Sequence, residues 1–209
     1  MASRGSELQR AARAARRVLD GMTRQAARQR NLLSGLVGPT PVLDCRVHFP
    51  AGDAHDARRG YRYFYHCHDG HGRRAGEHGH FHLFADGRTA GEVTHLVAIA
   101  VDARGLPQRM FMPNRWVTNE RVRSAAQVLR LIDGFALRRP LALRAVSDWL
   151  TNLLVMFRPQ LRALLRNRDA RVREGRRGLL DDRRVAVLSQ CKVSLSAQAA
   201  ALDAALLRA

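Results

Sequence analysis

Apolar residues recur every three or four positions at both ends of the chain and follow a shorter period in the middle. The first segment predicts an amphipathic helix that begins at Ser6, its expected N-cap, and continues to about Arg30. Its apolar stripe consists of Leu8, Ala12, Ala15, Leu19, Met22 and Ala26. Two glycines and two prolines between Gly35 and Pro41 interrupt any helix, so the first boundary is expected there.

The middle of the chain, from about Val42 to Val117, consists of short β-prone runs separated by glycine, aspartate and proline. Five strands are predicted, at Val42–Phe49, Tyr61–His68, His78–Phe84, Thr94–Val101 and Arg109–Val117. Their short connections favour an antiparallel meander.

The helical period returns after Thr118, which is expected to cap a helix that Gly134 ends. Further helices are expected, with Pro140 in a first turn and a kink or restart at Pro159. The predicted remainder is a basic connection at Arg171–Arg184, a short strand or helical turn at Val185–Leu188 and a helix from about Ser194 to Arg208.

The fold class that follows is α+β: an antiparallel β-meander of about five strands, preceded by an N-terminal helix and followed by a bundle of C-terminal helices. We expect one domain with three regions. These are a basic amphipathic helix in residues 1–36, a histidine-rich sheet region in 42–117 and a helical region in 118–209 that packs on the sheet.

All nine histidines lie between His48 and His95, and five of them fall into two alternating runs, His66-Cys67-His68 and His78-Gly79-His80-Phe81-His82. Successive side chains of a strand point to opposite faces, so paired strands would gather these imidazoles on one face and the tyrosines and Cys67 on the other. Imidazole binds zinc, iron, copper and nickel.

The sequence therefore predicts a transition-metal site, and in one version a metalloenzyme that acts on an anionic small molecule. The expected ligands are His66, His68, His78, His80 and His82, with His95 and Glu77 as additional candidates. Glu77 could instead orient a ring. A hydrogen-bonded, partly solvated sheet surface is the competing interpretation, and His48, His55 and His71 are expected to be loop or surface residues.

The run His78–Phe84 resembles the His-φ-His-φ-His-φ-φ motif of the histidine-triad nucleotide hydrolases and transferases. That resemblance implies a metal-free alternative in which His80 attacks the α-phosphorus of a nucleotide and His78 and His82 support it.

A broader resemblance covers most of residues 42–170. It is carried by Tyr61–His68, Gly76–Phe84, Thr94–Pro107 and Asn114-Arg115-Trp116-Val117-Thr118. These segments together resemble an uncharacterised bacterial family known as a domain of unknown function, and the resemblance implies no activity.

The formal net charge is +18 and is unevenly distributed. Residues 1–30 carry eight arginines against two acids, whereas residues 31–98 carry seven of each, so the histidine segment is neutral. The basic segments allow a second alternative, a module that binds nucleic acid nonspecifically through residues 4–30 and 158–184. Without an apolar leader or an apolar run of about 18 residues, we expect a cytoplasmic protein that does not enter the membrane.

Overall fold

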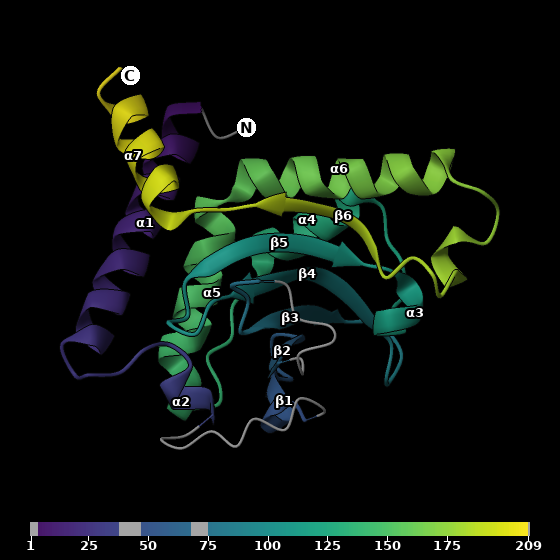
Figure 1. Ribbon diagram of the computed structural model, residues 1–209, viewed down its shortest axis with the longest axis horizontal. Coiled ribbons are helices and arrows are strands. Elements are labelled where there is room, and N and C mark those ends of the chain that lie inside the picture. The colour runs from purple at the N-terminus through teal and green to yellow at the C-terminus, as the bar shows by residue number, and fades with distance from the viewer. Residues whose placement is uncertain (1–3, 38–46, 68–74, 209) are drawn as a thin grey trace.

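A six-stranded antiparallel sheet, with its strands in chain order, forms the centre of the molecule (Figure 1). The computed structural model describes residues 4–37, 47–67 and 75–208. The strands are β1 (Phe49–Asp56), β2 (Tyr61–Cys67), β3 (Gly79–Asp86), β4 (Val93–Val101), β5 (Pro107–Pro113) and β6 (Val187–Lys192). The α+β class is confirmed, but the sheet has six strands instead of five, because β6 returns from the C-terminal region to pair with β5.

Helices precede the sheet and follow its fifth strand. They are α1 (Arg4–Ala26), α2 (Ser34–Val37), α3 (Arg115–Thr118), α4 (Ala125–Gly134), α5 (Arg144–Met156), α6 (Arg158–Glu174) and α7 (Leu195–Leu206). Short 3-10 turns lie at Leu141–Leu143 and Leu179–Asp181. Helices α4 and α6 contact the strands, whereas α1 packs beside α5 and α7 (Figure 1). No helix in the described ranges is both long and apolar enough to cross a membrane.

One face of the sheet forms the core with the helices. Tyr63, Tyr65, Phe81 and Leu83 are fully buried in the same apolar cluster as Leu150 and other residues of α5 and α6. The Tyr63 hydroxyl lies 3.2 Å from the Ser147 hydroxyl of α5, so a polar contact also joins β2 to this helix. Burial of one large apolar side chain stabilises a fold by about 1.5–3 kcal/mol. The core therefore fixes which residues of β2 and β3 point away from the helices.

The first strand was misplaced by the sequence pattern. Val42–Phe49 was predicted, of which residues 42–46 lie outside the described part, and β1 instead begins at Phe49. Gly52 (φ 78°) and Asp53 (φ 60°) have left-handed backbone conformations where the pairing of β1 with β2 shifts between Phe49 and Ala54. Such a bulge lets a strand continue through residues that otherwise indicate a turn.

Several helix and strand boundaries also differ from the predictions. Ser6 lies inside α1, which begins at Arg4 and ends at Ala26. Strand β5 ends at Pro113, because the Asn114 side chain accepts a bond from the Arg115 amide and starts α3.

Farther along the chain the corrections concern caps and lengths. Ser124, not Thr118, caps α4, in a capping box with Gln127. Helix α6 extends to Glu174, into the expected connection, and Pro159 lies in its first turn, as a restart requires. Ser194 caps α7, close to the expected start of that helix.

Candidate metal centre

Strands β2 and β3 bring three histidines together on the face of the sheet opposite the helices. In the antiparallel register His66 lies directly across from His80, and Phe64 lies across from His82. Because His80 and His82 are two residues apart, they share a face. The predicted parity is confirmed: Tyr63, Tyr65 and Phe81 point into the core, and Cys67, across from Gly79, is on their side.

The three imidazoles are close enough to hold one metal ion. One ring nitrogen each of His66, His80 and His82 lies within 4.8 Å of the other two. The Nε2 atoms of His66 and His80 are 2.7 Å apart. Tetrahedral zinc at about 2.0–2.1 Å from each nitrogen places its ligand atoms roughly 3.4 Å apart. A shared ion therefore requires this pair to open by less than about 1 Å.

His95 of β4 contacts His82 from the other side. The Nε2 atom of His95 lies 3.0 Å from Nδ1 of His82, and both side chains are buried. If His82 binds a metal through Nε2, its proton is on Nδ1 and donates to His95. That tautomer makes His95 the acceptor that orients His82, the usual arrangement around histidine ligands.

Glu120 holds the backbone next to this pair. Its Oε2 accepts the His95 amide proton at 2.9 Å, and its Oε1 accepts from the Thr118 hydroxyl at 3.2 Å. Burial raises the pKa of Glu120 to about 7, against smaller lowering contributions from the His95 amide and the Arg168 charge. The segment before α4 is thereby tied to the start of β4.

Burial keeps the inner imidazoles neutral. It lowers the pKa of His82 well below 6.5, and positive charge on the neighbouring histidines, His80 first, would lower it further. Burial, followed by the nearby Arg168 guanidinium, lowers the pKa of His95 to about 3. Neutral imidazole is the form that binds metals, so the fold presents His82 in its ligand state at neutral pH.

Aromatic rings surround the group. The ring of Phe64 is 5.1 Å from that of His82, and the ring of Phe111 is 5.1 Å from that of His80. His48 stacks on Phe64 at 3.6 Å and lies 6.1 Å from the His66 ring. His80 is 6% exposed and His82 is 3% exposed, whereas His66 is only partly buried. Solvent therefore reaches the group on the His66 side.

The other predicted ligands have different positions. His78 is turned toward the core-facing Tyr65, whose hydroxyl lies 2.5 Å from its Nδ1. Glu77 forms a double ion pair with Arg109, at 2.7 and 3.0 Å. His68 and His71 lie outside the described residues. Of the five expected ligands, the structure thus gathers three, His66, His80 and His82.

Sequence patterns did not identify two neighbours of the site, His48 and Glu120. His48 lies inside the strand predicted at Val42–Phe49 and directly before the observed β1, and no periodic pattern linked it to Phe64. Glu120 lies 25 residues after His95, within the helix that was predicted to begin at Thr118, although α4 begins only at Ala125. As a polar residue of a predicted helix, Glu120 carried no local indication that it would be buried.

Comparison with known proteins gives a family and no activity. A family model described as a domain of unknown function, DUF6969, matches residues 12–193. No curated protein and no solved structure matches the chain.

Proposed function

Because the chain belongs to DUF6969, a family of unknown function, we propose its function from the site alone: the protein binds one transition-metal ion through His66, His80 and His82. The observation that carries this proposal is the convergence of three ligand nitrogens from two adjacent strands within 4.8 Å. Three imidazoles form a donor set suited to zinc, copper, iron or nickel.

The surroundings of the three side chains support metal binding over a merely solvated sheet surface. A solvated surface needs no burial, yet His80 and His82 are 6% and 3% exposed. Three imidazoles this close together can share one cation when they are neutral, and neutral imidazole is the form that binds metals. His95 supplies the partner that a ligand histidine normally has on its second nitrogen.

We propose further that the centre is of the catalytic kind, with an open coordination position. Structural zinc sites use four protein ligands, whereas catalytic sites use three and leave one position for water or substrate. His66 is the most exposed of the three ligands. An open coordination position therefore lies on its side of the group, within reach of solvent. An ion held there would supply Lewis-acid chemistry, while His95 and the aromatic rings orient the ligands and limit access of water.

The direct test is metal content. Tag-free protein is incubated with Zn²⁺, dialysed and analysed by elemental mass spectrometry. We expect about one ion per chain in the wild type. His66→Ala and His80→Ala should each weaken binding at least about tenfold, since loss of one ligand removes a metal bond.

A matched control is His55→Ala. His55 is a β1 histidine that pairs with Asp86 at 2.8 Å and does not belong to the three-histidine group. Its loss should leave the zinc content unchanged. If the alanine variants fail to fold, His66→Asn replaces them in the test, because it keeps a polar side chain at a partly exposed position. Wild-type protein that retains no zinc, or equal retention by all variants, contradicts the proposal.

Substitution with Co²⁺ tests the open position. A four-coordinate site gives intense visible absorption that shifts when a small anion such as azide enters the open position. We expect such a shift. A spectrum that azide does not change would indicate a closed structural site.

A further inference from the structure

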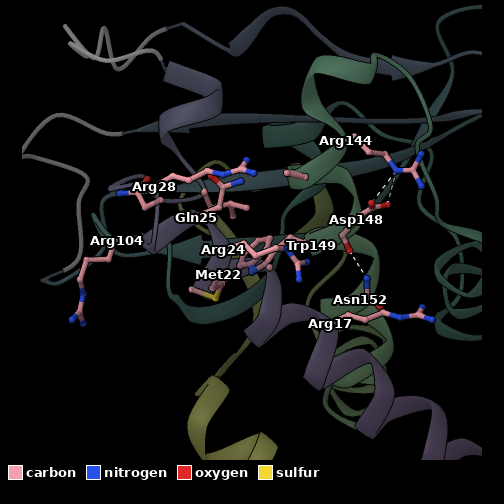
Figure 2. Close-up of a pocket in the computed structure, with 14 residues that line it drawn as sticks. Arg17, Met22, Arg24, Gln25, Arg28, Arg104, Arg144, Asp148, Trp149 and Asn152 are labelled. Atoms are coloured by element: carbon pink, nitrogen blue, oxygen red, sulfur yellow. Dashed lines mark hydrogen bonds and ion pairs between the residues drawn. The ribbon is translucent and has the colours of Figure 1, made fainter.

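A hollow of about 540 Å³ lies between α1 and α5, and no residue of the metal centre lines it (Figure 2). Its size is in the range of small-molecule pockets, roughly 300–1,000 Å³. Its walls come from the second half of α1, the turn after it, the turn between β4 and β5, and α5 from Arg144 to Asn152. Five arginines line it: Arg17, Arg24, Arg28, Arg104 and Arg144.

The positive charges of this hollow are only partly compensated. Among the described residues its single lining acid is Asp148, which Arg144 bonds at 2.9 Å, and Arg104 pairs with Asp102 at 3.4 Å. Arg17, Arg24 and Arg28 form no ion pair with any residue that the structure describes. These three arginines leave the hollow with an excess of positive charge, which a bound anion would balance.

The rest of the lining is apolar or neutral. Met22, Leu32 and the buried Trp149 contribute apolar surface. The half-buried Gln25 also lines the hollow, and its side-chain amide has no hydrogen-bond partner within the described ranges. This composition fits a ligand that joins a strongly anionic group to an apolar portion.

We propose that the hollow is a second binding site, for a small organic phosphate such as a nucleoside diphosphate. The phosphate oxygens lie at Arg17, Arg24 and Arg28, and the apolar portion lies against Met22 and Trp149. A guanidinium matches two phosphate oxygens with two parallel N–H bonds. A phosphate monoester carries about −1.5 to −2 charges at neutral pH. Phosphate therefore balances three arginines better than a carboxylate does.

The test uses Trp149 as its reporter. The chain has two tryptophans, so Trp116→Phe leaves Trp149 alone. ADP, inorganic pyrophosphate and succinate are titrated into this protein, with binding followed by Trp149 fluorescence and by calorimetry. We expect saturable binding of ADP and pyrophosphate, much weaker binding of succinate, and a change of Trp149 emission with ADP.

Two triple variants with the same change of charge separate the hollow from the general surface. Arg17→Gln/Arg24→Gln/Arg28→Gln should weaken ADP binding at least about tenfold, because charge-assisted contacts are lost. The control, Arg13→Gln/Arg166→Gln/Arg177→Gln, removes three exposed arginines that do not line the hollow. It should change the affinity less than about threefold, through long-range charge alone. If the first triple variant fails to fold, the single variant Arg28→Gln takes its place in the ADP titration.

Several results would overturn the proposal. These are the absence of saturable binding by both ADP and pyrophosphate, succinate binding as tightly as pyrophosphate, and equal losses in the two triple variants. A single-stranded oligonucleotide that binds more tightly than ADP, with equal losses in both variants, would identify a nucleic-acid surface instead.

Discussion

Glu120 makes the stability of this protein depend on pH in a direction opposite to that of most carboxyl groups. It is 8% exposed, and burial raises its pKa from 4.5 to about 7. The folded state therefore favours the neutral acid. Its stabilising contribution is complete below pH 4.5 and is lost as the pH rises through about 7. A rise in the pKa of this carboxyl from 4.5 to about 7 corresponds to about 3 kcal/mol of stability.

The variant Glu120→Gln removes this titration and keeps the shape of the side chain. The amide oxygen can accept the His95 amide proton, and the amide nitrogen can donate to the Thr118 hydroxyl, so both contacts have a replacement. At pH 5 the variant should be more stable by less than about 1 kcal/mol. At pH 8 the variant should be more stable, by up to about 3 kcal/mol.

Urea denaturation of both proteins at pH 5 and pH 8 measures this difference. The stability that the buried, neutral His82 and His95 contribute to the folded protein is lost as the pH falls below 6.5. Both proteins contain these histidines, so this contribution cancels in the comparison. Glu7→Gln, on the exposed side of α1, controls for the removal of one carboxylate. An equal stability difference at the two pH values would refute a buried Glu120 that titrates near neutrality.

Three further predictions concern packing, a buried ion pair and metal linkage. Gly79→Ala would place a Cβ 2.4 Å from both the His66 carbonyl oxygen and the Tyr65 hydroxyl. Urea denaturation should therefore show that the free energy of unfolding falls by about 3 kcal/mol. The control Gly35→Ala, whose Cβ would have no atom within 4 Å, should leave it nearly unchanged. Arg109→Met leaves the Glu77 carboxylate, 12% exposed, without its ion-pair partner and should cost about 3–5 kcal/mol. The double variant Arg109→Met/Glu77→Leu should recover much of the lost stability. A double variant as unstable as Arg109→Met alone would contradict this account. Zinc at 100 times its Kd should raise the melting temperature by about 5–10 °C in the wild type and in His55→Ala but not in His80→Ala, as calorimetry can check.

The sequence predicted the elements whose pattern is local. Period-two alternation placed β2 and β3 within one or two residues at each end and identified their faces, because one face of each strand is apolar and buried. Parity alone places His66, His80 and His82 on one face, but it also assigns His78 to that group, whereas the structure turns His78 toward Tyr65. The capping box of α4 was also present in the sequence, as Ser124 and Gln127, although Thr118 was expected to cap this helix.

Long-range pairing could not be predicted in this way. Strand β6 begins 74 residues after the end of β5, and its six residues have no strong alternation between buried and exposed positions. Which distant segment completes a sheet edge depends on how the helices between them pack, and no local pattern contains that information. The same holds for Glu120, whose burial depends on where the chain before α4 meets β4.

His95 shows how one irregularity determines the composition of a site. In a regular strand it would share a face with Val97 and Ile99, which point into the core. The pairing of β3 with β4 instead shifts between Leu83 and Phe84, so Val97 lies across from Leu83 but His95 lies across from Phe84. This single extra residue moves His95 to the histidine face, where it contacts His82. A bulge can therefore supply the orienting partner of a metal ligand at a position that alternation alone assigns to the core.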